Sequence, residues 1–371
     1  MPTLLKDYYD KAFVTRLAEA VTAEASGFDG RAFTRAVLAA PWSDLALKQR
    51  MRRITTLLGR HLPGDFARQV TVLDRIAPRF TGLTALVFPD FVEVFGLDDP
   101  QRSLRVLEHV TRYSTAEFAI RPFIARDPDG TMAELRRWAT HDNEHVRRLA
   151  SEGCRPRLPW GMALQEFKRN PGPVLEVLEI LKADPSEYVR RSVANNLNDI
   201  GKDHPDVLLE VASRWHGQSV GTDRLLKHAC RTLLKRGDPR ALGLFGLSDD
   251  VGAEVRRLTV TPARVSIGDR VTFAFEVRHA SVAPATLRLE YAVAFARPGG
   301  KSFRKVFQIV ERPFAAGWHA FERRHAFRDL TTRKHHPGPH VLTVIVNGRP
   351  AATKTLRLLG ARTPPRARSA R

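Results

Sequence analysis

Cysteine is scarce in this chain of 371 residues, and several familiar signatures are missing. Two cysteines, Cys154 and Cys230, exclude the small domains that depend on several disulfides. No apolar run approaches the length of a membrane span, and the first residues lack the apolar core of a secretory signal. Phosphate-binding glycine loops and the Gly-x-Ser-x-Gly nucleophile motif are also missing. These absences predict a cytoplasmic protein that has no membrane association.

Acidic residues are outnumbered by basic ones, and the excess is unevenly placed. The chain has 60 Lys and Arg residues against 40 Asp and Glu residues, a formal net charge of +20. The last 121 residues hold 23 of the basic residues and 7 of the acidic ones, a net charge of +16. Such asymmetry favours a polyanionic partner, with nucleic acid ahead of an anionic membrane, although a basic surface can also serve solubility alone.

The first 250 residues have a helical texture with an internal repeat. Apolar residues recur at spacings of three and four, and the sequence of 144–148 returns as 187–191, a shift of 43 residues. A fainter third copy matches Leu225, Ala229, Leu233 and Gly237 to positions 36 residues earlier. Paired-helix repeats of the HEAT type have this length, so residues 1–250 are predicted to form a HEAT-like solenoid. An ordinary helical bundle is the alternative.

Residues 251–360 change to a period of two, which is typical of strands. Turn signals separate the runs, at Pro298-Gly299-Gly300 and at Asn347-Gly348. About seven strands in this length predict an immunoglobulin-like β-sandwich, here without the usual cysteine pair. The expected strands lie near 271–277, 287–295, 303–310, 318–324, 341–346 and 353–358. Residues 361–371 are rich in Arg and Pro and are expected to be disordered, so the predicted fold class is a multidomain α-plus-β protein.

The two clear repeat helices have polar stripes opposite their apolar ones. The apolar stripes are Val146, Leu149, Ala150 and Gly153 in one helix, and Val189, Val193, Leu197 and Ile200 in the other. The polar stripes hold Arg148, Glu152, Arg191, Asn195 and Asp199. Stacked repeats would bring these five side chains to one concave surface, as a candidate site. The alternative is a solvated face of ordinary ion pairs.

Other candidates stand near this surface. Glu117 fits a capping-box pattern and could simply cap its own helix. Trp160 follows Arg155, Arg157 and Pro159 in one proline-bracketed loop, where it could stack on a base or pack in a core. Four histidines, at 325, 335, 336 and 340, lack metal-ligand spacing, and both cysteines are expected to be small core residues. No metal site and no cofactor are predicted.

Four segments resemble one family, the bacterial DNA alkylation repair glycosylases of the AlkC/AlkD HEAT-like superfamily, and specifically its AlkC branch. The segments are residues 42–51, 114–123, 146–161 and 189–200, of which the run from Val146 to Gly161 is the most specific. The region after 250 resembles the immunoglobulin-like extension found in part of this branch, on residues 337–340 and 346–348.

The resemblance implies a monofunctional DNA glycosylase for cationic N3-methylated bases, 3-methyladenine and 3-methylcytosine, which begins base excision repair. It implies site residues at Glu117, Glu152, Trp160 and Asp199, with Arg148 beside them. A methylated cationic base is already a good leaving group, so the enzyme's task is to stabilise a cationic sugar and hold a water. Glu152 is our candidate for that role, and a shallow groove is expected in place of an enclosed pocket.

Contacts to double-stranded DNA are expected from both predicted domains, in a bacterial enzyme that works as a monomer at the nucleoid. The DNA-contacting candidates are Lys48, Arg155, Arg157, Arg190, Arg191, Asn195, Arg333, Lys334 and His335. The basic β-domain is predicted to close on the DNA and to raise the number of phosphate contacts, with Arg323 and Arg324 as further candidates.

Two rival functions remain open at the level of sequence. A non-catalytic HEAT scaffold could bind DNA or a protein partner, although acids on a DNA-facing surface would repel phosphate. A membrane-surface protein could use the basic tail to bind anionic lipid.

Overall fold

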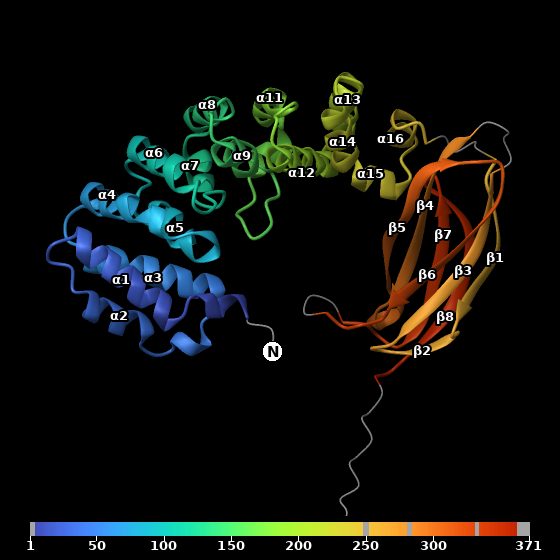
Figure 1. Cartoon of the computed structure of the whole chain (residues 1–371), viewed down its shortest axis with the longest axis horizontal. Helices are drawn as coiled ribbons and strands as arrows, with labels where there is room; N and C mark the ends of the chain where they lie inside the picture. Colours follow the sequence, from blue (N-terminus) through green and yellow to red (C-terminus); the bar gives the residue numbers. More distant parts are fainter. Residues whose placement is uncertain (1–3, 248–251, 280–283, 331–333, 362–371) are drawn as a thin grey trace, which may run out of the picture. The chain divides into compact units, whose positions relative to one another are not determined.

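The computed structural model describes residues 4–247, 252–279, 284–330 and 334–361. The chain divides into two compact units, Met1–Ala229 and Cys230–Arg371. The first is helical, and the second is built around β-sheets (Figure 1). The expected fold class, a HEAT-like helical repeat with an immunoglobulin-like β-sandwich, is confirmed. The expected Arg-rich tail lies outside the described residues, except Ala361.

The first unit is a succession of α-helices that follow one another in chain order (Figure 1). Asp or Asn side chains cap many of their N-termini, and proline opens several first turns, as at Asp99-Pro100. The helices are α1 (Lys11–Glu24), α2 (Gly30–Leu38), α3 (Leu47–His61), α4 (Phe66–Ile76), α5 (Val87–Phe95), α6 (Pro100–Val110), α7 (Ile120–Arg126), α8 (Pro128–Trp138), α9 (Glu144–Gly153), α10 (Gln165–Arg169), α11 (Gly172–Leu181), α12 (Glu187–Asp203), α13 (Pro205–Trp215) and α14 (Val220–Ala229). Short 3₁₀ turns connect some of them: η1 (Leu5–Tyr8), η2 (Trp42–Asp44), η3 (Ala77–Arg79) and η4 (Gly82–Leu86).

The sequence repeat corresponds to helices that pack side by side. Helix α12 lies between α9 and α14, which are the helices of the second, first and third copies (Figure 1). The predicted apolar stripes of α9 and α12 are buried. The third copy is interrupted, because α14 ends at Ala229 and a new helix begins at Arg231. The faint match through Leu233 and Gly237 therefore spans two helices.

The second unit contains two sheets and two short helices. Strands β1 (Glu254–Thr261), β3 (Arg270–His279) and β6 (Gly317–Ala326) form an antiparallel sheet in the order β1-β3-β6. A five-stranded sheet has the order β2-β8-β7-β4-β5, from β2 (Arg264–Ser266), β4 (Ala285–Ala296), β5 (Ser302–Phe314), β7 (Gly338–Val346) and β8 (Arg349–Leu359). The helices are α15 (Arg231–Arg236) and α16 (Pro239–Leu244), and η5 (Pro298–Gly300) joins β4 to β5. All six expected strands are present, and β1 and β2 are additional.

Apolar side chains of the strands fill the sandwich, with Phe273, Phe275, Tyr291 and Leu342 among them. The predicted Asn347-Gly348 hairpin joins β7 to β8, and both residues have positive φ, at 43° and 78°. Gly348 also touches the backbone of Gly237 between α15 and α16, where a Cβ would lie 2.7 Å from Gly237 Cα. Within the described residues, no helix is both long and apolar enough to cross a lipid bilayer.

Candidate functional site

Two neighbouring repeat helices bring acidic side chains to one place. Glu152 lies in the last turn of α9, and Asp199 lies in the second half of α12. Both are buried, with 5% and 1% of the residue exposed. Unpaired carboxylates at that depth would be costly, so the surroundings must supply counter-charges.

Arg155 links the two acids. It follows the end of α9, and its guanidinium donates to Glu152 Oε1 at 2.5 Å and to Asp199 Oδ2 at 2.7 and 2.9 Å. Burial works against the charge of Arg155, but Glu152 and Asp199 outweigh it and raise the pKa of this guanidinium above its usual value. The expected contact of Arg155 with phosphate stays a prediction. Its side chain is 7% exposed and is already engaged by two carboxylates.

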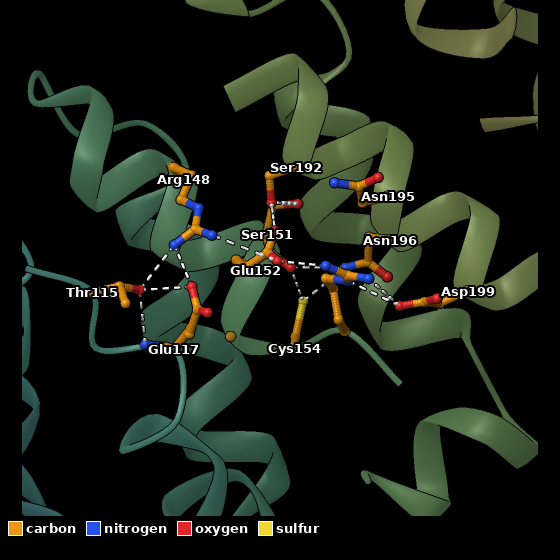
Figure 2. Close-up of polar contacts among 12 residues, drawn as sticks. Thr115, Glu117, Arg148, Ser151, Glu152, Cys154, Ser192, Asn195, Asn196 and Asp199 are labelled. Atoms are coloured by element: carbon orange, nitrogen blue, oxygen red, sulfur yellow. Dashed lines mark hydrogen bonds and ion pairs between the residues drawn. The ribbon is translucent and has the colours of Figure 1, made fainter. Parts of the chain in front are cut away.

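Glu117 approaches the same centre from the segment before α7. Its Oε2 accepts hydrogen bonds from the Thr115 hydroxyl at 2.7 Å and from Arg148 Nη1. Arg148 also reaches Glu152 Oε1 at 3.5 Å, so that it joins Glu117 to Glu152. The alternative that Glu117 simply caps its own helix is wrong, because α7 begins at Ile120 after Ala119 and has no side-chain cap. Glu117 instead pairs with an arginine of α9, as Figure 2 shows.

The carboxylate oxygens differ in how fully they are occupied. Glu152 Oε2 accepts from the Ser192 hydroxyl at 2.6 Å, and Asp199 Oδ1 accepts from Lys202 at 2.7 Å. Both oxygens of Glu152 and both of Asp199 therefore have protein partners. Glu117 Oε1 has no hydrogen-bond or ion-pair partner among the residues that the structure describes. It is the carboxylate oxygen in this cluster that is left for a ligand or a water.

The aromatic candidate stands at the rim of the cluster. Trp160 lies in the segment between α9 and α10, has a positive φ of 65° and is 65% exposed. The ammonium group of Lys48 from α3 donates to the Trp160 carbonyl and lies 4.8 Å from the centre of the Phe118 ring. A positive φ is uncommon for a residue with a side chain as bulky as that of Trp.

A cavity of about 1110 Å³ opens between α3, α5 and these residues. Lys48, Glu117, Phe118, Glu152, Arg155 and Trp160 line it, together with apolar side chains such as Leu47, Met51, Leu86 and Met162. Asp199 is not among the lining residues and lies behind Arg155. The cavity is open to solvent along one side, so the expectation of a groove in place of an enclosed pocket stays a prediction.

Four of the residues that are expected to contact DNA have protein partners outside the carboxylate cluster. Arg191 is exposed and pairs with Glu187 at 3.1 Å, and Asn195 binds His228 Nε2 at 3.1 Å, so neither joins the carboxylates. Arg190 donates to the carbonyls of Asp184 and Pro185. Arg157 is exposed and pairs with Asp203.

In the β-unit, His335 is 6% exposed, and its ring lies 5.3 Å from that of Phe295. The expected DNA contact at His335 is therefore wrong, because the ring is buried among aromatic side chains. Lys334 is exposed, and Arg333 lies outside the described residues. Cys154 and Cys230 are buried as expected, and burial raises the pKa of both thiols to about 12.

Some participants were not foreseen from the sequence. Ser192 and Thr115 complete the hydrogen bonding of the acids, and Arg121 binds the backbone below them. Only Arg121 has a sequence signal, as a charged residue among Ile120, Pro122 and Phe123, whereas Ser192 and Thr115 stand among polar residues.

A second ion cluster on the cavity wall was also missed. Arg52 of α3 donates at 2.7 Å to both Asp90 and Glu93 of α5. Burial raises the pKa of Asp90 and Glu93. The described residues contain no group of three or more His, Cys, Asp or Glu side chains that could hold a metal ion.

The chain is similar to one family model and to known proteins over most of its length. Residues 254–360 match the family model "Uncharacterised protein YhaZ, C-terminal Ig-like domain". The uncharacterised protein YhaZ of Bacillus subtilis (strain 168) is 44% identical over 345 residues, which cover 93% of this chain and 96% of YhaZ. The solved alkylpurine DNA glycosylase AlkC of Pseudomonas fluorescens, bound to DNA containing an abasic site analogue, is 38% identical with a TM-score of 0.93. That match covers 96% of this chain and 100% of the AlkC chain.

Proposed function

Because this chain belongs to the AlkC family of alkylpurine DNA glycosylases, we propose that it hydrolyses the N-glycosidic bond of cationic N3-methylated bases in double-stranded DNA. The substrates in this proposal are 3-methyladenine and 3-methylcytosine, and the products are the free base and an abasic site. The enzyme acts as a monomer in the bacterial nucleoid. The observation that supports this best is the cluster of three carboxylates that Arg148 and Arg155 hold together, two of which, Glu117 and Glu152, line the cavity.

The chemistry follows from the charge of the substrate. Methylation at N3 leaves a positive charge on the base, so the base departs as a neutral molecule and needs no proton from a general acid. The bond that breaks leaves the sugar with oxocarbenium character, which nearby carboxylates stabilise as they do in glycoside hydrolysis. A water then adds to the sugar carbon and loses a proton to solvent, so the products are the neutral base, the abasic sugar and one proton.

The environments of the three carboxylates suggest different roles. Glu152 lines the cavity, and three side chains fix the orientation of its carboxylate: Arg148, Arg155 and Ser192. We assign to it the electrostatic stabilisation of the sugar cation. Glu117 also lines the cavity, and its Oε1 is open, so it is suited to hold the attacking water. Asp199 lies behind Arg155 and keeps that arginine in place.

Trp160 supplies the contact to the nucleotide. Its ring is mostly exposed at the rim of the cavity, beside the cationic Lys48. An indole face attracts both a stacked base and a positive charge, so a methylated cationic base is a suitable partner. Arg148 and Arg155 remain paired with carboxylates and offset the cost of burying these charges.

The proposal is tested by incubating the purified protein with methylated duplex DNA and identifying the released bases by mass spectrometry. We expect 3-methyladenine and 3-methylcytosine among the products. Release of no methylated base, with DNA binding retained, would contradict the proposal and favour the scaffold function.

A further inference from the structure

Arg121 is a buried cation that binds no acid. It lies in the first turn of α7, and none of its surface is exposed. Its guanidinium donates to three backbone carbonyls, those of Gly153 and Arg155 at 2.8 Å and that of Met162 at 2.5 Å. No carboxylate pairs with it in the part of the chain that the structure describes. Burial lowers its pKa to about 10, so the group remains charged at neutral pH.

The three carbonyls lie at the two ends of one loop. Residues 154–162, here called the tryptophan loop, connect the end of α9 with the segment before α10. Gly153 and Arg155 stand at its start and Met162 at its end, so one guanidinium holds both ends together. Burying a charge is unfavourable, and an apolar side chain could fill the same volume. An apolar side chain could not donate these three hydrogen bonds, so they are the reason for an arginine at this position.

The tryptophan loop contains two residues of the site. The Arg155 side chain bridges Glu152 and Asp199, and its own carbonyl accepts from Arg121. Trp160 is in a left-handed conformation, which is unfavourable for a bulky side chain and persists only where the surroundings impose it. Lys48 holds the Trp160 carbonyl from the other side of the cavity.

We propose that Arg121 is a positioning residue for base excision: it fixes the tryptophan loop and, through the loop, aligns Arg155 with the two carboxylates and Trp160 with the cavity. This inference rests on the proposed function of Glu152 and Trp160. Arg121 lies outside the cavity lining and touches neither the reacting atoms nor the side chain of an acid. Its effect should therefore appear in the chemical step and leave DNA affinity unchanged.

The test uses the full chain with Arg121→Lys and Arg121→Met. Single-turnover release of 3-methyladenine is measured beside affinity for DNA containing an abasic site analogue. We expect excision to slow by about 10²-fold, because small displacements of catalytic groups have effects of this size. Affinity should stay close to that of the wild type. The quenching of Trp160 fluorescence by acrylamide should also differ between the wild type and the Arg121 variants. The Trp160 signal of each protein is obtained by subtracting the fluorescence of the same protein with Trp160→Phe.

Arg147→Lys is the matched control. Arg147 also donates to two loop carbonyls, of His141 and Asp142, and it pairs with Asp184. It does not contact the tryptophan loop. Excision by Arg147→Lys should therefore stay near the wild-type rate. Normal excision by Arg121→Lys, or an equal loss in the control, would overturn the proposal.

Two further variants keep the outcome interpretable. If neither Arg121 variant folds, Lys48→Met loosens the same loop from its exposed end. Because Lys48 is also an expected DNA contact, its single-turnover release is measured at saturating protein, where weaker DNA binding has no effect on the rate. This release should be slower than in the wild type, and an unchanged rate would overturn the proposal. Glu152→Gln is measured alongside. Normal excision by Glu152→Gln contradicts the proposed function itself, whereas its loss together with normal excision by Arg121→Lys removes only the present inference.

Discussion

At the scale of single residues, the site depends on how buried charges are paired. Glu152 and Asp199 share one arginine, and Glu117 and Glu152 share another. Such pairs offset the cost of burying carboxylates at this depth. The pairing also fixes their direction, which an electrostatic role in catalysis requires.

Removal of Arg155 should destabilise the fold strongly. Arg155→Met leaves Glu152 and Asp199 buried with less compensation, and breaking such a pair costs about 3–5 kcal/mol of the free energy of unfolding. Arg157→Met is the control from the same loop, because the exposed pair of Arg157 with Asp203 is worth about 0–1 kcal/mol. Urea denaturation of the two variants measures the difference. Equal losses would show that Arg155 is not a structural counter-charge.

The two cysteines should be unreactive in the folded protein. Burial raises the pKa of the Cys154 and Cys230 thiols to about 12, so little thiolate exists near neutral pH and no reagent reaches it. We expect a chromogenic disulfide reagent to modify neither thiol at about pH 8 in the native state, and both after denaturation. Rapid native reaction of one thiol would contradict the described burial.

At the scale of helices and loops, the sequence repeat predicts which helices pack together. No comparable pattern predicts where the side chains of the connecting segments point. The 43-residue shift correctly places α9 beside α12, because apolar stripes at helical spacing must be buried against a neighbour. The approach of Glu152 to Asp199 follows from that stacking. The direction of Arg155 does not, because it lies beyond the end of α9, where helical spacing no longer determines where a side chain points.

The same reasoning explains other misassigned residues. His335 lies in an irregular segment before β7, and no periodic pattern indicates that its ring turns inward to Phe295. Arg191 and Asn195 belong to the polar stripe of α12, as does Asp199. Arg191 pairs with Glu187 of the same helix and Asn195 binds His228, so neither contacts Glu152 or Asp199. Helical spacing identifies the face and leaves the partner undetermined.

The stability that His340 contributes to the β-sandwich near β7 should decrease in acid. Burial lowers the pKa of His340 below its ordinary 6.5, and its ring lies among Phe295 and Phe327. Since the unfolded chain then binds the proton more readily, the stability due to His340 is present above pH 6.5 and is lost as the pH falls through that value. The melting temperature of His340→Phe should depend less on pH between neutrality and pH 5 than that of wild type. His336→Phe is the control, and equal pH dependence in both would contradict this prediction.

At the scale of the whole molecule, charge is divided between two tasks. The helical region holds a nearly balanced charge and the buried acids, whereas the region after 250 has a net charge of +16. A basic β-unit can bind phosphates without base contacts and so raise affinity for any duplex. The helical unit would then provide selectivity for the lesion.

Phosphate contacts of the β-unit can be measured by their salt dependence. The triple variant Arg323→Ala, Arg324→Ala, Lys334→Ala removes three exposed cations. Each lost phosphate contact should lower the slope of log affinity against log salt by about 0.9. Lys354→Ala, an exposed cation on β8, is the control for a general loss of charge. An unchanged slope in the triple variant would exclude these residues from DNA binding.

The central claim is that a carboxylate held at the cavity stabilises the sugar cation, and Glu152→Gln tests it most directly. The substitution keeps shape and removes charge, and Glu187→Gln on the exposed side of α12 is the matched control. The account predicts that single-turnover release of 3-methyladenine by Glu152→Gln falls by about 10²–10³-fold, with DNA affinity near that of wild type and of the control. Excision at the wild-type rate by Glu152→Gln would contradict the account.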